Sequence, residues 1–188
     1  MPDSKTIAFL IAPEGTERVE LTEPWAAVRD AGHQLRLLST DEGEAQLFDH
    51  LDRAEKVTVD GRVQEASPDD YDALVLPGGV ANPDHLRLQP DAVKFIGSFI
   101  ESGKPVAAIC HAPWTLVEAD VVRDRQLTSW PSLQTDIRNA GGDWVDERVV
   151  ADGNLITSRK PPDLPAFIAA LLEAVNHGVD SADDAVEG

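Results

Sequence analysis

Short runs of consecutive apolar residues recur along the chain, separated by longer stretches in which apolar residues return every three or four positions. The short runs are apolar throughout instead of alternating with polar residues, which is typical of strands buried on both faces of a parallel sheet. Four strands are predicted on this basis: Ile7 to Ile11, Gln34 to Leu38, Ala73 to Leu76 and Pro105 to Ile109.

The longer stretches have the spacing of amphipathic helices. One leads through Trp25 to the helix-ending Gly32, and another, Pro90 to Ile100, begins with a proline and an acidic residue. A helical pattern also follows Pro113, and a final one spans Leu164 to Val175. Strand and helix alternate, so the sequence predicts an α/β fold with a doubly wound, mostly parallel sheet and helices on both faces.

Two segments alternate polar and apolar residues around an Asp-Gly pair, which is a strong hairpin signal. They are Lys56 to Gln64 and Val145 to Thr157, and we expect both to form small antiparallel additions at the sheet edge. No linker divides the chain. A single domain is therefore predicted over residues 1–178, followed by a mobile acidic tail over residues 179–188.

The composition narrows the classes of partner. Asp and Glu number 34 against 16 Lys and Arg, a formal net charge of −18 over 188 residues, which disfavours nucleic acid and anionic membranes. A single cysteine rules out an internal disulfide, and no secretion signal or membrane-length apolar run is visible, so we expect a cytoplasmic protein with a reduced thiol. Nucleotide-binding glycine motifs and paired metal-ligand spacings are missing, so no cofactor and no metal are expected.

That single cysteine, Cys110, follows a predicted strand and precedes a predicted helix, with His111 directly behind it. Open α/β sheets bind ligands at the carboxyl ends of their strands. A helix N-terminus beside the sulfur favours thiolate, so we expect Cys110 to ionise below the usual thiol pKa of about 8.5. The alternative is that Cys110 is buried and has only a packing role. His111 argues against this alternative, because imidazole can pair with a thiol.

Two further loops leave the same edge of the predicted sheet. The loop after the first strand carries Glu14, Glu17 and Glu20, and a carboxyl beside the thiol would hold its proton because like charges repel. We favour Glu17 for this role. The third strand ends in Pro77, Gly78 and Gly79, where glycine lets the backbone approach a ligand or adopt a positive φ.

The stretches LVLPGG, GKPVAAICHAP, LTSWPSLQTDIRNAGGDWVDERVVADGNLITSR and PPDLPAF, in this order, resemble the PfpI side of the ThiJ/PfpI superfamily. The resemblance extends from about Thr6 to Val175. It implies a flavodoxin-like fold with a cysteine on a strained turn, and a homodimer or larger assembly with the active site near the interface.

Position by position, the resemblance implies a catalytic set of Cys110, His111, Glu17 and Asp84, with Asp84 orienting the histidine of a neighbouring subunit. It further implies oxyanion or substrate-binding roles for Gly78, Gly79, Ala112 and Trp130. The superfamily usually has glycine where this chain has Ala112.

Two classes of function follow from these residues. The first is a cysteine-dependent stress enzyme that acts on reactive carbonyls or glycated adducts, or on peptides. We favour small carbonyls, because a peptide carbonyl is a poor electrophile whose cleavage needs a well-aligned general acid. The second is a non-enzymatic redox sensor or stress chaperone that uses the oxidisable Cys110. A class I amidotransferase is less favoured, because no His-x-Glu pair follows the cysteine.

Overall fold

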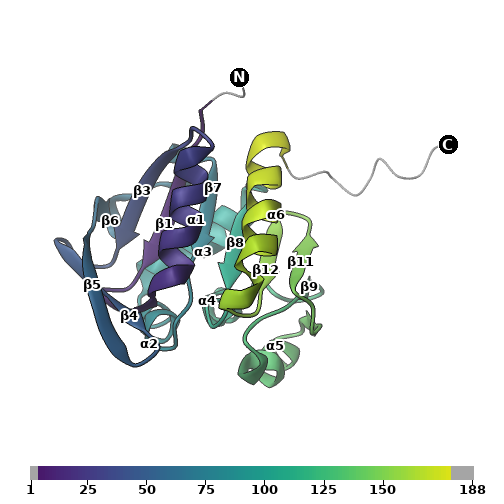
Figure 1. The fold of residues 1–188 in the computed structure, drawn as a ribbon. Helices are drawn as coiled ribbons and strands as arrows, with labels where there is room; N and C mark the ends of the chain where they lie inside the picture. Colours follow the sequence, from purple (N-terminus) through teal and green to yellow (C-terminus); the bar gives the residue numbers. More distant parts are fainter. Residues whose placement is uncertain (1–3, 179–188) are drawn as a thin grey trace.

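Seven strands form the central sheet of the computed structural model, which describes residues 4–178 (Figure 1). In spatial order they are β11 (Val149–Asp152), β12 (Leu155–Ser158), β8 (Val106–Ile109), β7 (Ala73–Leu76), β1 (Thr6–Ile11), β3 (Gln34–Ser39) and β6 (Gly61–Arg62). All neighbouring strands are parallel except β11, which pairs antiparallel with β12. The four predicted strands are β1, β3, β7 and β8, so the predicted flavodoxin-like α/β fold is confirmed.

Helices cover both faces of this sheet because successive strand residues point to opposite sides. Figure 1 shows α1 (Arg18–Asp30) and α6 (Leu164–His177) in front of the sheet, and α3 (Pro90–Glu101) and α4 (Pro113–Glu118) behind it. Phe9 of β1 belongs to the same buried cluster as Phe167 of α6. Its neighbour Leu10 belongs to the opposite cluster, with Phe99 of α3. Two further short helices, α2 (Ala81–Leu86) and α5 (Gln134–Asn139), lie near the carboxyl edge.

Two small sheets flank the central one. Strands β2 (Glu14–Glu17), β4 (Glu44–Asp49) and β5 (Asp52–Thr58) form the first, and β9 (Gln126–Leu127) and β10 (Asp143–Trp144) form the second. Four short 3-10 turns complete the described elements: Val63–Glu65, Pro68–Asp70, Pro131–Leu133 and Pro161–Asp163.

One predicted hairpin is confirmed and the other is wrong. The Asp-Gly pair at Asp152 joins β11 to β12 as expected. The strands on either side of Asp60 do not pair with each other. Strand β5, before it, pairs antiparallel with β4, and strand β6, after it, pairs parallel with β3. The Asp60 carboxylate accepts a hydrogen bond from Leu37 N at 2.7 Å, and Asp60 N donates to Leu37 O at 2.8 Å. These bonds tie the segment to the main sheet, and the hairpin turn lies instead at His50, with φ +57°.

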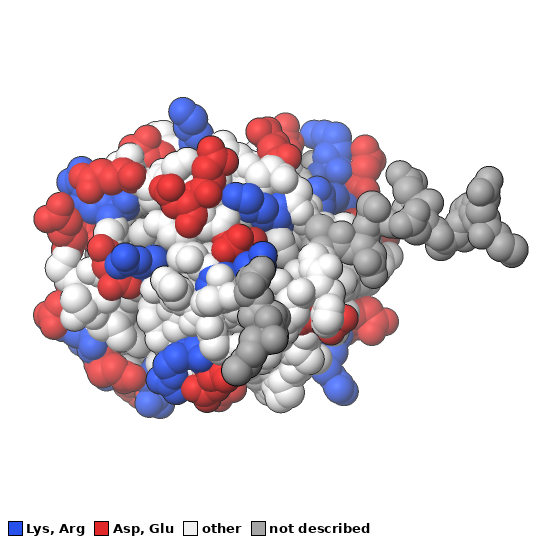
Figure 2. Space-filling model, turned by 90° about the horizontal axis from the view of Figure 1, so that it is seen from above, with Lys and Arg blue, Asp and Glu red and all other residues white. Residues whose placement is uncertain are grey.

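The surface carries both signs of charge. Figure 2, seen from above Figure 1, shows acidic and basic side chains spread over that face without a broad basic patch. Within residues 4–178 no helix combines the length and apolar character that a membrane crossing requires. The acidic tail predicted at 179–188 lies outside the described residues.

Candidate active site

Cys110 directly follows β8 on a strained turn with φ +64°, a left-handed conformation that is uncommon for residues other than glycine. Hydrogen bonds fix this turn from two sides: Cys110 N donates to Ser158 O at 3.0 Å, and Cys110 O accepts from Trp130 N at 2.8 Å. Backbone strain of this kind clusters at functional sites, where the surrounding structure maintains it. The turn therefore holds the sulfur in one place at the carboxyl edge of the sheet.

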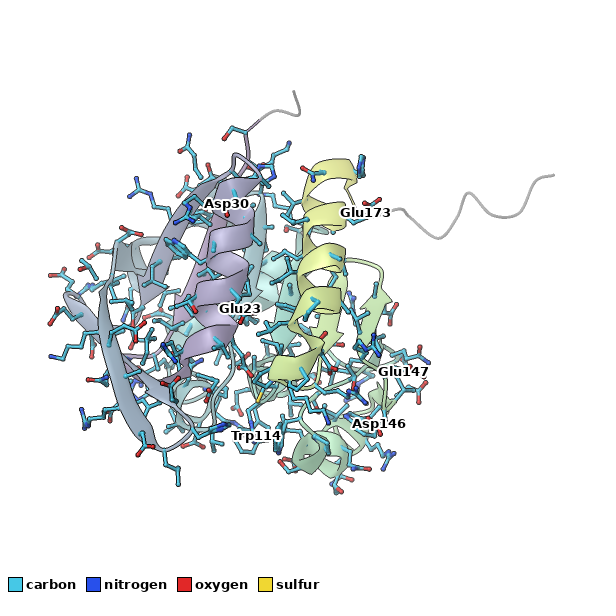
Figure 3. All side chains as sticks on the ribbon, viewed as in Figure 1. Glu23, Asp30, Trp114, Asp146, Glu147 and Glu173 are labelled. Atoms are coloured by element: carbon cyan, nitrogen blue, oxygen red, sulfur yellow. The ribbon has the colours of Figure 1, made fainter. Side chains whose placement is uncertain are left out.

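His111 lies on the same side of the turn as the thiol. Its Nδ1 is 3.2 Å from Cys110 Sγ, a contact that two neighbours in an extended strand would not make. The ring stacks on Trp130 with centroids 5.5 Å apart and packs at a tilt against Trp114 at 5.4 Å. Figure 3 labels Trp114 at the lower edge of the molecule. Burial lowers the pKa of His111 to about 4, so its ring is neutral at pH 7.

The carboxyl that faces the sulfur belongs to Glu20, and the choice of Glu17 for this place was wrong. Glu20 is fully buried, its Oε2 accepts from Gly78 N at 2.8 Å, and its side chain hydrogen-bonds the Cys110 thiol in a way that affects the pKa of both groups. Glu17 ends β2 and accepts from His50 N at 3.0 Å. Because β2 extends to Glu17, α1 begins only after this residue. Glu20, in the first turn of α1, is therefore the glutamate that reaches the thiol.

One signal in the sequence would have found Glu20. It shares the buried face of α1 with Leu21, Pro24 and Val28, and an acid on an apolar helix face is rarely there without a partner. Sequence reasoning also missed Asn82, a fully buried residue of α2. Asn82 Oδ1 accepts from Ala12 N at 2.7 Å, and Nδ2 donates to the carbonyls of Pro77 and Gly78 at 2.9 and 3.0 Å. Asn82 thereby joins the two loops that build the site.

The thiol and Glu20 form a coupled pair. Burial and the charge of Glu17 raise the pKa of Glu20 to about 8, so this carboxyl keeps its proton at pH 7. Burial raises the pKa of the Cys110 thiol, and Glu20 adds to this rise only when it is ionised, whereas the backbone N–H groups of Gly79 and His111 act in the opposite direction. Desolvation of the sulfur opposes the expected low thiol pKa, which stays a prediction, and attack by a protonated sulfur needs a nearby proton acceptor.

The raised pKa of Glu20 predicts a pH-dependent stability. Between about pH 4.5 and 8 Glu20 holds a proton in the folded chain that it has lost in the unfolded chain, so its contribution to the free energy of unfolding falls as pH rises. From pH 6.5 to 8 we expect the wild type to lose on the order of 2 kcal/mol more than Glu20→Gln does, because the contribution of His111 is common to both proteins and cancels in the comparison. Urea unfolding at several pH values measures it. The exposed Glu23, on the outer face of α1 (Figure 3), gives the matched control Glu23→Gln, and identical slopes in all three proteins would contradict the assignment.

The turn after β7 brings backbone donors to the site. Gly79 has φ +84°, and a Cβ there would collide with the carbonyl oxygen of Gly15 and lie 2.7 Å from Glu17 N. At Gly78 a Cβ would collide with the Glu20 carboxyl and lie 2.6 Å from the Cys110 Cβ. Both positions thus require glycine, and the Gly79 amide faces the sulfur, where it lowers the thiol pKa.

A pocket of about 700 Å³ opens over the sulfur. Five of the predicted site residues line it: Glu17, Gly79, Cys110, His111 and Trp130. The other lining residues are Glu14, Gly15, Glu20, Phe48, His50, Leu51, Arg53, Val80, Ala81 and Pro161.

The remaining predicted site residues lie outside this lining. Gly78 is buried behind the pocket, and Ala112 is buried just before α4. Asp84 is exposed on α2 and is not among the residues around the pocket. Within residues 4–178, no three His, Cys, Asp or Glu side chains gather to form a metal site.

The sheet order and the cysteine on a strained turn define a class, the flavodoxin-like α/β proteins with a reactive thiol at the carboxyl edge. Residues 5–174 match the DJ-1/PfpI family. The chain belongs to this family, which confirms the resemblance seen in the sequence and the PfpI type of enzyme that it implies.

Three known proteins illustrate the relationship. Protein/nucleic acid deglycase 2 of Escherichia coli K12 is 43% identical over 165 residues, which cover 87% of this chain and 94% of that protein. General stress protein 18 of Bacillus subtilis is 40% identical over 152 residues, covering 80% and 87%. The crystal structure of Drosophila melanogaster DJ-1beta aligns with a TM-score of 0.84 at 28% identity, covering 94% of this chain and 92% of that one.

Proposed function

We propose that this protein is a cysteine-dependent stress enzyme that acts on reactive carbonyls and on the adducts they form with amino groups, in the manner of a glyoxalase or deglycase. The observation that carries the proposal is the protonated Glu20 carboxyl at the Cys110 thiol, inside a pocket large enough for a small adduct. The deglycase and stress-protein names of the relatives support the same activity.

The first step joins the sulfur to the aldehyde carbon of a methylglyoxal-like substrate. As the C–S bond forms, the thiol proton passes to the neutral His111 Nδ1, 3.2 Å away. The amides of Gly79 and His111, which face the sulfur, stabilise the negative oxygen. Glu20 then gives its proton to this oxygen, or, with an aminocarbinol adduct, to the amine that leaves as the C–N bond breaks.

The second step moves a proton between neighbouring carbons. Glu20, now a carboxylate, takes the proton from the sulfur-bearing carbon while His111 gives the former thiol proton to the ketone oxygen, so that an enediol forms. Glu20 then returns its proton to the former ketone carbon as His111 takes the hydroxyl proton of the sulfur-bearing carbon. The first carbon is thereby oxidised to a thioester and the second is reduced to a carbinol, so no outside oxidant is needed. Water then hydrolyses the thioester, releasing lactate and restoring the thiol.

The site favours this chemistry over peptide cleavage. A peptide needs a strong general acid for its amine leaving group and an extended groove for the chain on both sides of the bond. The pocket instead is a cavity of about 700 Å³ whose lining includes the bulky Trp130 and Pro161. Glu17 lines the pocket, and its charge raises the pKa of Glu20. Glu20 therefore keeps the proton that it transfers to the substrate.

We further propose a homodimer or larger assembly in which the exposed Asp84 orients the His111 ring of a second copy. The resemblance motivates this arrangement, because no carboxylate of the described chain hydrogen-bonds His111. A nucleophilic thiol also fits the cytoplasm, which keeps thiols reduced. Light scattering at micromolar concentration tests the assembly, and a monomer would remove the role of Asp84.

A substrate screen tests the activity. We expect the wild type to release lactate from methylglyoxal and from methylglyoxal-treated amino acids, with Cys110→Ser reducing the rate at least about 1,000-fold because the serine hydroxyl is a far weaker nucleophile. Fluorogenic peptides are included in the same screen. Peptide cleavage without lactate, or equal lactate release by the serine variant, would refute the proposal.

A further inference from the structure

The ring of His111 has one polar contact within residues 4–178, the 3.2 Å approach of Nδ1 to Cys110 Sγ. The torsion that rotates an imidazole ring has only broad energy minima, so neighbouring groups must fix the plane of the ring. A functional histidine is usually fixed by a hydrogen bond at its second nitrogen. Here two indoles contact the imidazole: Trp130 stacks on it at an interplanar angle of 21°, and Trp114 packs against it at 59°. The described chain therefore orients this ring by aromatic packing.

Trp114 is itself held by residues of two other elements. Its Nε1 donates to Asp136 Oδ2 on α5 at 2.8 Å. The guanidinium of Arg87, at the end of α2, lies over the indole with its Cζ 5.7 Å from the ring centroid, and Arg87 Nη2 pairs with Glu118 Oε2 at 3.0 Å. Trp114 is not among the residues that line the pocket, so it reaches the reacting atoms only through His111.

We infer that Trp114, anchored by Asp136, is a positioning residue that keeps His111 Nδ1 directed at the thiol. This inference rests on the proposed function, in which that nitrogen accepts the thiol proton. Proton transfer requires a distance and a direction that a freely rotating ring would meet only part of the time. The proposed contact with Asp84 of a second copy decides which ring nitrogen carries the proton, whereas Trp114 sets the plane of the ring.

The same indole keeps water from the imidazole. Burial lowers the pKa of His111 to about 4, and a neutral ring can accept the thiol proton whereas an imidazolium cannot. Trp114 packs directly on this ring, so it supplies part of that burial. Loss of the anchor at Asp136 loosens the indole and admits water, which moves the pKa of His111 toward its usual value of about 6.5. The orientation and the protonation state of the base thus depend on one anchored side chain.

Kinetics with two substitutions at Asp136 test the inference. Asp136→Leu removes the acceptor of the indole N–H, and Asp136→Asn keeps an acceptor oxygen at the same place. We expect Asp136→Leu to lower kcat for lactate release from methylglyoxal about 10- to 100-fold with KM changed less than about twofold, and Asp136→Asn to keep kcat within about threefold of the wild type. The exposed Thr135 of the same helix gives the control Thr135→Leu, which should keep the wild-type kcat.

A titration is independent of turnover. The NMR signal of the His111 Cε1–H proton, assigned with a His111→Asn variant, is followed against pH. It should report a higher pKa in Asp136→Leu than in the wild type, and an unchanged pKa in Thr135→Leu. A substitution that only weakened the fold would lower the free energy of unfolding without moving this pKa in the folded protein.

A second variant removes the donor instead of the acceptor. Trp114→Phe keeps an aromatic ring but cannot donate to Asp136, so it should act like Asp136→Leu, and the double variant should lose no more kcat than either single one. An unchanged kcat or pKa in Asp136→Leu, no recovery in Asp136→Asn, or fully additive losses would overturn the inference. If the wild type yields no lactate, the proposed function fails, and the titration still decides whether Asp136 anchors the indole against His111.

Discussion

Replacing Glu20 with glutamine should lower kcat for lactate formation about 100- to 1,000-fold, the usual contribution of a positioned acid–base group. Glutamine keeps the size of the side chain and its acceptor toward Gly78 N, a bond of 2.8 Å in the wild type. It has no proton to give to the oxyanion or the leaving amine, and no carboxylate to take the C–H proton afterwards. Coupled lactate assays across pH 6 to 9 measure the effect.

The controls separate chemistry from folding. Glu23→Gln on the exposed face of α1 should keep kcat within about twofold, because a surface substitution rarely perturbs the core. Glu20→Asp retains an acid one methylene further from the sulfur and should recover part of the rate. A Glu20→Gln protein that folds and turns over at the wild-type rate would assign the proton transfers to His111 instead.

The largest effect on stability is expected at Gly79. Alanine there must adopt a φ near +84° and place its Cβ against the Gly15 carbonyl oxygen and 2.7 Å from Glu17 N. These neighbours are backbone atoms of the loop that carries the site, so they cannot move without displacing it. We expect Gly79→Ala to lower the free energy of unfolding by about 4 kcal/mol or more, measured by urea denaturation.

Gly103 offers the matched control. It has a similar φ of +76°, but a Cβ there would meet nothing within 4 Å. Gly103→Ala should therefore cost only the intrinsic left-handed penalty of about 1 kcal/mol. Equal losses in the two variants would mean that backbone conformation alone, and not the close approach of Gly15, requires glycine at position 79.

The local pattern of apolar and polar residues was sufficient to predict much of the fold. The continuous apolar runs of β1, β7 and β8 appear as strands in the sequence because each is buried on both faces. The turn at Cys110 was also predictable, since a strand that ends in Cys-His lies directly before a helical pattern, and the resemblance to the family implied that this turn is strained. These features depend on neighbours along the chain.

The missed features depend on contacts between distant segments. Glu14, Glu17 and Glu20 recur at every third position, and only the pairing of β2 with β4 decides that the helix begins after Glu17 and turns Glu20 inward. The Asp60-Gly61 pair has the composition of a hairpin, but its bonds to Leu37 join it to a strand more than twenty residues earlier. Neither pairing has a signature in the local sequence, although the apolar helix face that Glu20 shares with Leu21, Pro24 and Val28 indicates its inward direction.

The reactive groups of this site are tuned by burial and backbone amides, with no ion pair at Cys110, His111 or Glu20 within the described residues. Dissolved ions screen exposed charges over about 8 to 10 Å at physiological ionic strength but reach buried groups poorly. Added salt therefore acts on the approach of charged molecules to the acidic surface, while the proton transfers at the sulfur proceed in surroundings that salt hardly alters. The rate at which charged substrates reach the site thus depends on ionic strength, whereas the rate of the proton transfers hardly does.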